Sequence, residues 1–427
     1  MKKILIISYS FNRKEIIGSI RLRGLAKFLP RFGYEPIILA AKFPNITKDN
    51  NEEYKVIETF NEPLIVKWKK FLNLSQNKTF KEQIKVEDTK KNHKSKTDIL
   101  LELWEEIFAY PDLQKNWFKP AIISADKIME DNEISAIISS SMPVTAHLIA
   151  NKIKETYNIP WIADLRDLWS NNQYNNYSKI RKFFDLRLER RVLSAANAIT
   201  TVSPILTESL SNLHNRNDIF SIPNGFDPEL INPRIPLTDK LSITYTGNLY
   251  SGKRDPEILF KALAELSSSK DICLKDFLIN FYGQKEFWLH KLIVDYSLQK
   301  TVELHGLIPR EEVIKKQWES QLLLLLTWDN PKEKGVIPAK IFEYLAAKRP
   351  ILSYGLSEGC VQTILENTSS GSQFNGIDEI KKAIIDYYIE YKSEGEITYK
   401  GKLNEINKFS HQYMTKRFVD ILNQISA

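Results

Sequence analysis

Several short segments of this 427-residue chain place glycines or charged side chains directly after an apolar run, where a ligand could bind. In residues 245–259 (YTGNLYSGKRDPEIL), an apolar run leads into two glycines, the first of them Gly247, and then into Lys253 and Arg254. A proline two residues later favours a helix start. Glycines let backbone approach a ligand, and two cations beside a helix N-terminus can hold a diphosphate. The alternative is an ordinary strand–helix turn with solvated cations.

A second pattern lies in residues 334–355 (KGVIPAKIFEYLAAKRPILSYG), where Pro338 begins a predicted helix. Lys340 and Glu343 are three residues apart, so they share one flank of that helix. A carboxylate can accept hydrogen bonds from both hydroxyls of a ribose, and a lysine near a helix start can meet phosphate. A surface ion pair on a core helix is the alternative.

The segment IPWIADLRDLW, residues 159–169, ends a predicted buried strand in Asp164, Arg166 and Asp167. Charged residues at the carboxyl end of a strand lie where ligands bind in open α/β sheets. We therefore take Asp167 and Arg166 as the candidate catalytic residues. The alternative is a structural ion pair between an aspartate and the arginine.

The first strand–helix turn, residues 8–23, holds Gly18, Ser19, Arg21 and Arg23 ahead of the first long helix. It has no G-x-G-x-x-G pattern, which counts against an enzyme that binds nicotinamide or flavin. The chain also lacks Asp-x-Asp, a carboxylate pair suited to clamping Mg²⁺ on a diphosphate. We predict no cofactor and no metal, with phosphate charge met by cations and helix dipoles.

Short apolar runs alternate with amphipathic helical patterns, and these elements must position the segments above. The predicted strands are residues 3–8, 36–40, 134–139, 161–163, 198–202, 219–222, 241–246, 278–282, 302–304, 322–327 and 350–353. The clearest predicted helices are residues 19–32, 143–157, 204–213, 255–266 and 338–347. Strands that alternate with helices of this length predict βαβ units and parallel sheets.

Four prolines and an Asn-Gly turn interrupt the periodicity at residues 221–240, which we take as a linker. Before it, residues 1–220 form a predicted Rossmann-like domain. After it, residues 241–408 form a second one, followed by a C-terminal segment, residues 409–427. Residues 44–100 are rich in Lys, Glu and Asn and are predicted to be a charged excursion from the first domain.

Composition narrows the class of protein. Apolar residues make up 43% of the chain, too many for a disordered one, and the net charge of +7 favours anionic partners. A lysine-rich solvated surface is the alternative reason for that charge. Lys and Arg are spread along the chain, so we expect no nucleic-acid partner. Cys273 and Cys360 form no CxxC or zinc spacing, which fits a reduced cytoplasmic compartment.

Membrane contact is predicted to be peripheral. The N-terminal apolar run is too short for a signal peptide, and the run at residues 322–326 is far below the ~20 residues of a membrane span. Cations of a predicted basic helix are candidates for contact with anionic lipid: Lys179, Arg181, Lys182, Arg187, Arg190 and Arg191. The alternative is a solvated helix face on which these cations pair with Asp185 and Glu189.

Taken together, the segments resemble the GT-B-fold glycosyltransferases of family 4, the group 1 glycosyltransferases. The subgroup of bacterial polysaccharide and lipopolysaccharide clusters is most similar. The resemblance rests on SSSMPVTAHLIA, IPWIADLRDLW, ANAITTVSP, IPNGFD, YTGNLYSGKRDP and PAKIFEYLAAKRPIL, which occur in the family's order. It covers both domains and leaves out residues 44–100.

The resemblance implies an α/β GT-B fold, with two Rossmann-like domains whose parallel sheets face each other across a cleft. It implies a retaining, metal-independent transfer from a nucleoside-diphosphate sugar, held mainly by the C-terminal domain. The acceptor is expected to be a glycan or a lipid-linked glycan, reached from the cytoplasmic face of the membrane. Together with the residue patterns above, it gives the candidate donor-binding residues Gly18, Gly247, Asn248, Lys253, Arg254, Lys340 and Glu343. It also implies that residues 1–220 are the acceptor-side domain and that residues 409–427 are the family's closing helix, which crosses back onto the first domain.

Within that set, Glu343 matches the family's ribose-binding glutamate, and Lys253 with Arg254 matches its diphosphate-binding lysine. Gly18 matches the glycine of its N-terminal phosphate-side loop. The chain departs from the family at Gly335, where a first glutamate is expected, and at Asn248, where an arginine is common.

The usual N-terminal catalytic histidine is also missing, and Asp167 is the nearest polar candidate for its place. Two alternatives remain. One is a nucleotide-sugar 2-epimerase of the same fold, for which His305 and Asp167 are the material. The other is a sugar-nucleotide-binding protein without activity, which Gly335 supports.

Overall fold

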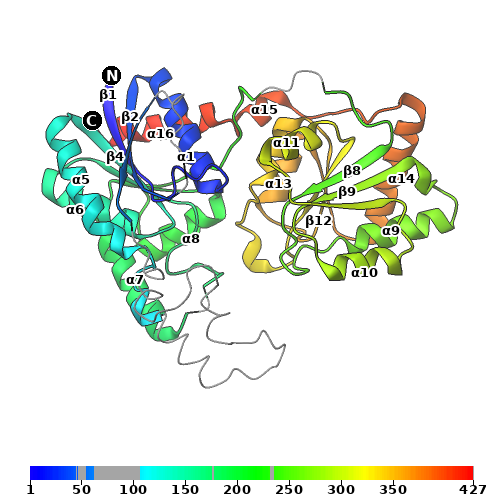
Figure 1. The fold of residues 1–427 in the computed structure, drawn as a ribbon, viewed down its shortest axis with the longest axis horizontal. Coiled ribbons are helices and arrows are strands. Elements are labelled where there is room, and N and C mark those ends of the chain that lie inside the picture. The colour runs from blue at the N-terminus through cyan, green and yellow to red at the C-terminus, as the bar shows by residue number, and fades with distance from the viewer. Residues whose placement is uncertain (45, 47–53, 62–105, 176, 231–234, 427) are drawn as a thin grey trace. The chain divides into compact units, whose positions relative to one another are not determined.

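The computed structural model describes residues 1–44, 46, 54–61, 106–175, 177–230 and 235–426 (Figure 1). The chain divides into two compact units. The first unit is Met1–Ile222 with Thr415–Ala427, and the second unit is Pro223–Met414. Most of the predicted charged excursion, residues 62–105, lies outside the described part of the chain.

The first unit is built on a parallel sheet in the order β3-β2-β1-β4-β5-β6-β7, seven-stranded within the described residues. Its strands are β1 Lys2–Ile7, β2 Tyr34–Ala41, β3 Lys55–Thr59, β4 Ile134–Ser141, β5 Trp161–Leu165, β6 Ala198–Thr201 and β7 Ile219–Ser221. Its helices are α1 Ile17–Phe28, α5 Phe118–Asp131, α6 Thr145–Tyr157, α7 Lys179–Leu193 and α8 Pro204–His214. Short 3₁₀ turns cover Leu29–Phe32 and Lys115–Trp117.

The second unit has a six-stranded parallel sheet in the order β10-β9-β8-β11-β12-β13. Its strands are β8 Leu241–Thr246, β9 Phe277–Tyr282, β10 Val302–Gly306, β11 Leu322–Leu326, β12 Ile351–Tyr354 and β13 Gly371–Phe374. Its helices are α9 Glu257–Ser268, α10 Phe287–Asp295, α11 Arg310–Trp318, α12 Lys340–Ala347, α13 Cys360–Thr368, α14 Ile377–Glu394 and α15 Leu403–Asn407. Short 3₁₀ turns cover Leu274–Asp276 and Pro331–Glu333.

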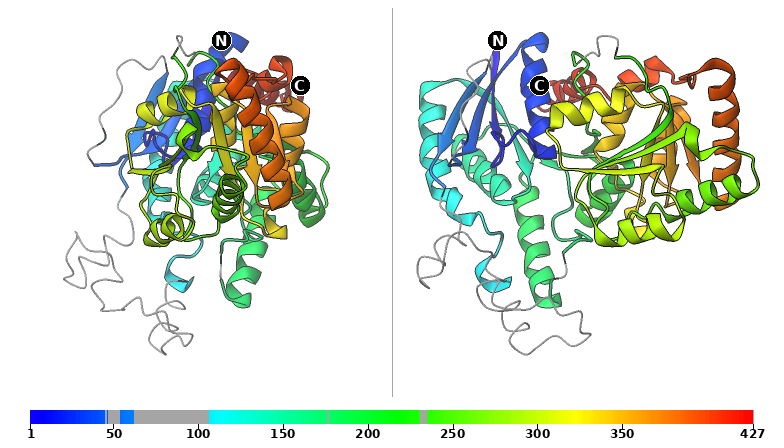
Figure 2. Two further views of the ribbon diagram at one scale, coloured as in Figure 1. Left: turned by 90° about the vertical axis from the view of Figure 1, so that its right-hand side faces the viewer. Right: turned by 45° about the vertical axis from the view of Figure 1, so that its right-hand side comes forward.

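Both sheets are covered by helices on their two faces (Figures 1 and 2). The five leucines of β11 show why such strands read as continuous apolar runs. Leu322, Leu324 and Leu326 join one hydrophobic cluster, while Leu323 and Leu325 join another that includes residues of α12 and α13. Because alternate side chains of a strand point to opposite faces, a strand buried on both sides must be apolar throughout.

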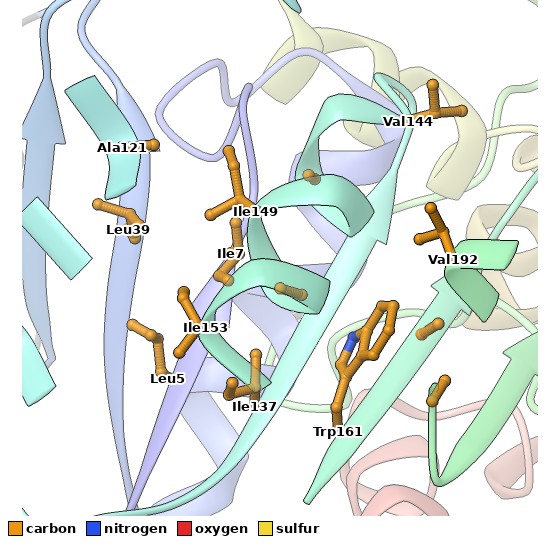
Figure 3. Packing of buried hydrophobic residues seen from close by; sticks show 14 of the residues in the cluster. Leu5, Ile7, Leu39, Ala121, Ile137, Val144, Ile149, Ile153, Trp161 and Val192 are labelled. Carbon is orange, nitrogen blue, oxygen red and sulfur yellow. The ribbon is translucent and has the colours of Figure 1, made fainter. Parts of the chain in front are cut away.

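In the first unit, α5 and α6 pack on one face of the sheet through aliphatic side chains and Trp161 (Figure 3). Ile149 and Ile153 of α6 lie against Leu5 and Ile7 of β1 in this cluster. Burying one such large apolar side chain stabilises the folded unit by roughly 1.5–3 kcal/mol. This packing fixes the position of β5, whose carboxyl end leads into the predicted residues Arg166 and Asp167.

The last helix, α16 His411–Ile425, begins in the second unit, and its residues from Thr415 onward belong to the first. There the Tyr34 hydroxyl donates to Asn423 Oδ1 at 2.6 Å, and the Arg21 guanidinium lies 5.3 Å from the ring centre of Phe418. Among the described helices, none is long and apolar enough to cross a membrane.

Every strand predicted from the sequence is present. The prediction missed two, β3 and β13, and each forms an edge of its sheet. β3 lies inside the predicted excursion of residues 44–100 and pairs in parallel with β2, so at least this part belongs to the sheet. The first helix also begins earlier than predicted, at Ile17, so Gly18 lies in its first turn rather than ahead of it.

Candidate functional site

The strand order of the second unit reverses between β8 and β11. In open α/β sheets, ligands bind outside the carboxyl ends of the strands at such a reversal. Gly247 follows β8 there and has a φ of +120°, a conformation that side chains rarely adopt. The start of α12 lies beside it, because a Cβ atom built on Gly247 would be 3.0 Å from Lys340 Nζ. The structure thus brings these two predicted residues together.

Lys340 is the most unusual residue at this position. Its ammonium nitrogen is buried, lies 3.6 Å from the ring centre of Tyr245, and has no hydrogen-bond partner among the described residues. Burial, together with the positive charge of Arg254, lowers the pKa of Lys340 well below its usual value, and Glu343 only partly opposes the shift. A buried amine without an acceptor is costly, and an anionic ligand would supply the missing acceptor.

Glu343 lies one turn further along α12 and is held from two sides. Arg310 Nη2 is 2.6 Å from one carboxylate oxygen, and Gln317 Nε2 donates to the other at 3.0 Å. The Glu343 side chain keeps 22% of its surface exposed. Gln317 also donates to Thr246 Oγ1 at 3.0 Å, which ties α11 to the end of β8. The carboxylate is therefore held in a fixed orientation, and two of its lone-pair positions are filled.

The other predicted donor residues of the second unit follow β8. Lys253 Nζ lies 4.3 Å from the ring centre of Trp328, and the Arg254 guanidinium lies 4.6 Å from that of Tyr250. Asn248 is exposed, and its side-chain oxygen accepts from the Tyr250 backbone N–H at 2.6 Å. Both cations are thus held against aromatic rings, which orients them without neutralising their charge.

A narrow hollow opens beside Arg254. Arg254 and Trp328 line it, together with Pro338 ahead of α12 and Gly359 ahead of α13. Lys334 also lines it and forms an ion pair of 2.7 Å with Glu358 at the rim. The hollow therefore adjoins two helix N-termini and carries basic groups, a combination suited to a phosphate-bearing ligand.

In the first unit, Asp164 has a structural environment. Its carboxylate accepts from Arg21 through Nε at 3.1 Å and Nη2 at 2.9 Å, and from the hydroxyls of Ser140 and Thr200 at 2.8 Å each. Burial alone would raise the pKa of Asp164, but the Arg21 charge and these hydrogen bonds outweigh it and lower that pKa. The buried pair of this segment is therefore Asp164 with Arg21, a residue 143 positions away.

Arg166 and Gly18 meet in the first unit. Arg166 Nε donates to the Ser141 carbonyl at 2.7 Å, and its guanidinium would lie 2.2 Å from a Cβ atom at position 18. Burial lowers the pKa of Arg166. Because Gly18 has no side chain, the Arg166 guanidinium can occupy this position. Asp167, the residue after Arg166, is exposed.

Two of the described histidines, His147 and His305, lie in structural surroundings. His147 on α6 is fully buried, with Nδ1 2.7 Å from the Ser139 hydroxyl, and burial lowers its pKa to about 4. His305 on β10 shares a 2.8 Å hydrogen bond with Asn280 and stacks on Tyr282 with ring centres 4.3 Å apart. Both rings have structural partners.

Sequence reasoning missed Arg310, Gln317, Tyr245 and Trp328, all of which contact predicted donor residues. The sequence does hold a signal that Arg310 lies at the start of a helix. The residue before it is a proline, which favours a helix start. The aromatic residues carry no such signal, since a buried or half-buried ring is usually part of the core.

No family model matches the chain, and no curated protein matches it. Solved structures match it over 99% of its length. A glycosyltransferase from Rickettsia africae ESF-5 is 15% identical, is covered over 98% of its chain and gives a TM-score of 0.61. Sucrose-phosphate synthase from Thermosynechococcus elongatus is 13% identical, with 99% coverage and a TM-score of 0.64. HepE from Anabaena, solved with UDP and glucose, is 14% identical, with 100% coverage and a TM-score of 0.63.

These likenesses extend through both units, and the identities are low, so they establish the fold. The chain has the two-sheet α/β architecture of GT-B glycosyltransferases, as the sequence predicted.

Proposed function

We propose that this protein is a glycosyltransferase that moves a sugar from a nucleoside-diphosphate sugar to a glycan or lipid-linked acceptor. The observation that carries the proposal is the buried, acceptorless Lys340, one turn from an aimed carboxylate at the strand-order reversal of the second unit. This arrangement supplies a cation for phosphate and a carboxylate for hydroxyls. It occurs in a fold that the chain shares with glycosyltransferases over its whole length.

In this proposal Glu343 accepts hydrogen bonds from the ribose hydroxyls, using the lone pairs that Arg310 and Gln317 leave open. Lys340, with Lys253 and Arg254 across the turn after β8, meets the diphosphate. The glycine at position 247 keeps side chains out of the space beside Lys340. The sugar itself would reach toward the hollow lined by Trp328 and Pro338.

The transfer forms a bond between an acceptor oxygen and the anomeric carbon and breaks the bond from that carbon to the diphosphate. The acceptor hydroxyl releases its proton to solvent, and the diphosphate leaves with one additional negative charge. Cations and the start of α12 stabilise that charge, which makes a metal-independent reaction our proposal. On the acceptor side, we assign Asp167 and Arg166 to the reaction, and we propose retention of the anomeric configuration on the family resemblance.

A panel of UDP-, GDP-, ADP- and CMP-sugars tests the function. We expect release of one nucleotide from one donor class, by slow hydrolysis alone or faster with a glycan acceptor, and unchanged rates in EDTA. Glu343→Ala should lower the rate at limiting donor, and Lys261→Ala on the exposed face of α9 is the matched control. Epimerised donor without nucleotide release would favour the epimerase alternative, and binding without turnover would favour the inactive one.

We further propose that the reaction takes place on the cytoplasmic side of the membrane, where nucleotide-sugars and lipid-linked acceptors meet. Activity on a short lipid-linked acceptor in vesicles, compared with its water-soluble headgroup, tests this placement. Equal activity on both would remove the need for a membrane.

A further inference from the structure

The outer face of α7 in the first unit combines apolar and basic side chains. Its exposed residues are Lys179, Ile180, Lys182, Phe183, Phe184, Arg187, Arg190 and Arg191. The acidic residues of this helix, Asp185 and Glu189, are both buried. A solvated surface helix normally carries mixed charge on its outer face, so a face of cations and large apolar groups needs an explanation.

The buried acids have partners inside the unit. Asp185 accepts from Arg181 Nε at 2.9 Å, and Arg181 also donates to the carbonyls of Glu106 and Pro111. Glu189 accepts from the Ser170 backbone N–H at 2.9 Å and lies 3.2 Å from His214. The prediction that Arg181 contacts lipid is therefore wrong, because it is a buried partner of Asp185.

The alternative prediction, that the cations of this helix pair with Asp185 and Glu189, is confirmed for Arg181 with Asp185 but not for the exposed cations of the outer face. Both acids are buried, with Asp185 against Arg181 and Glu189 against Ser170 and His214. Arg190 reaches the Leu213 carbonyl at 3.2 Å. Among the described residues of α7, the exposed cations at positions 179, 182 and 187 thus have no exposed acidic side chain beside them.

Three large apolar side chains lie between these cations. Ile180 keeps 72% of its surface exposed, Phe183 60% and Phe184 51%. The neighbouring segment adds exposed Ile107 and Phe108, and it is tied to the helix start because Glu106 accepts from the Ser178 backbone N–H at 2.8 Å. Adjacent exposed apolar residues on a water-soluble surface usually mark a binding surface.

We propose that the outer face of α7 docks the first unit on an anionic lipid bilayer. Phenylalanine and isoleucine side chains of a surface helix can enter the headgroup region while flanking lysines and arginines meet anionic headgroups. Charge selects this occupant over a second copy of the chain, since pairing two such faces would bring their cations together. The surface does not involve the donor site, so it stands or falls separately from the proposed glycosyl transfer.

Vesicle co-sedimentation tests the proposal on the full-length protein, with vesicles of phosphatidylcholine alone or with added phosphatidylglycerol. The wild type should pellet with the anionic vesicles, more weakly at high salt, and stay in solution with the neutral ones. The triple variant Lys179→Gln/Lys182→Gln/Arg187→Gln should bind about 100-fold more weakly, at about fivefold for each near-surface cation. Phe183→Ser/Phe184→Ser should also lose binding while keeping the wild-type melting temperature.

The control is Phe287→Ser/Lys291→Gln on α10 of the second unit, where the same residue types are exposed. It should bind vesicles like the wild type. The proposal is overturned if the wild type ignores anionic lipid, or if both α7 variants bind as well as the control. A change of oligomeric state in the α7 variants, with vesicle binding intact, would assign the surface to protein contact instead.

Discussion

Each unit of this protein buries a cation, and the two cations have opposite surroundings. In the first unit, Arg21 faces the carboxylate of Asp164, whose oxygens also accept from Ser140 and Thr200. In the second unit, Lys340 has an aromatic ring beneath its nitrogen and no hydrogen-bond acceptor among the described residues. One site is electrostatically complete, and the other lacks an anion.

The difference separates a structural charge from a binding charge. A fully paired buried arginine gains nothing from a ligand and loses much when its partner is removed. A buried amine without an acceptor destabilises the empty protein, and this cost is recovered when an anion binds. The comparison predicts that mutations in the first network change stability, while mutations around Lys340 change affinity.

The largest effect is expected for Asp164→Ala. It leaves Arg21 buried without its counter-charge, which should cost about 3–5 kcal/mol of unfolding free energy. Chemical denaturation of the variant is the measurement, and Asp167→Asn, an exposed change in the same segment, is the control. A loss below about 1 kcal/mol would show that Arg21 finds another partner and would end the contrast with Lys340.

The second expectation concerns His147, a buried histidine of the first unit that feels the charge of Asp164. Its pKa of about 4 lies below the ordinary 6.5 because burial disfavours the charged ring. The unfolded chain then binds more protons than the folded one between these values, so stability should fall as pH drops from about 6.5 to 4. The full loss is about 3 kcal/mol at 1.36 kcal/mol per pKa unit. His147→Asn should flatten this part of the stability–pH curve, and an unchanged curve would mean that other groups control it.

For Lys340→Met we expect the reverse of Asp164→Ala. Removing the buried amine should leave stability unchanged or raised, and nucleotide affinity should fall about 10–150-fold for a lost charge-assisted bond of ~1.5–3 kcal/mol. Calorimetric titration with the cognate nucleoside diphosphate measures the affinity. Lys253→Met, a change at an exposed lysine, is the control and should lose less nucleotide affinity.

The same titration, repeated at increasing pH in buffers of different ionisation enthalpy, should show proton uptake in the wild type and in Lys253→Met. It should be absent in Lys340→Met, because the bound phosphate restores the charge that burial suppresses. Equal uptake in all three proteins would mean that Lys340 is already charged in the free protein.

Glu343→Ala should weaken nucleotide binding by about tenfold, the lower end of what hydrogen bonds to a charged group give. The effect is moderate because Arg310 and Gln317 already occupy part of the carboxylate. The free energy of unfolding should change little, since the Glu343 side chain lies outside the hydrophobic cluster that α12 joins. Glu343→Gln keeps one acceptor oxygen, so its nucleotide affinity should lie between that of Glu343→Ala and that of the wild type. Wild-type affinity in Glu343→Ala would place the ribose elsewhere.

The smallest effect on stability is expected for Asp167→Asn, within about 0.5 kcal/mol, because the side chain is exposed. Turnover should fall while donor affinity stays the same, as our assignment of this residue to the acceptor side requires. A variant with wild-type turnover and a lowered melting temperature would make Asp167 structural, like Asp164.

The sequence predicts the fold well where burial imposes a pattern. Strands buried on both faces read as apolar runs, and β11 is the clearest case. The two missed strands, β3 (KVIET) and β13 (GSQF), are edge strands with one neighbour each, and none of the residues of β13 is buried. Such strands can be polar, so they leave no apolar signal.

The candidate site is predictable where a spacing has a physical meaning, as for Lys340 and Glu343 on one flank of a helix. Partners that come from distant segments are not. Arg21 and Asp164 are 143 positions apart, and nothing local shows that Arg21 points inward. In the same way, Arg181 is one of several similar cations in its segment, and the carbonyls that turn it inward lie about 70 residues earlier.

The five consecutive leucines of β11, whose side chains alternate between the two faces of the sheet, also affect how the second unit unfolds. The strand contributes Leu322, Leu324 and Leu326 to one hydrophobic cluster and Leu323 and Leu325 to the other. Neither cluster can therefore lose its central strand while the other stays intact, and opening on one side of the sheet exposes apolar surface on both. The two layers should behave as one cooperative folding unit, with the amides of β11 among the slowest to exchange with solvent.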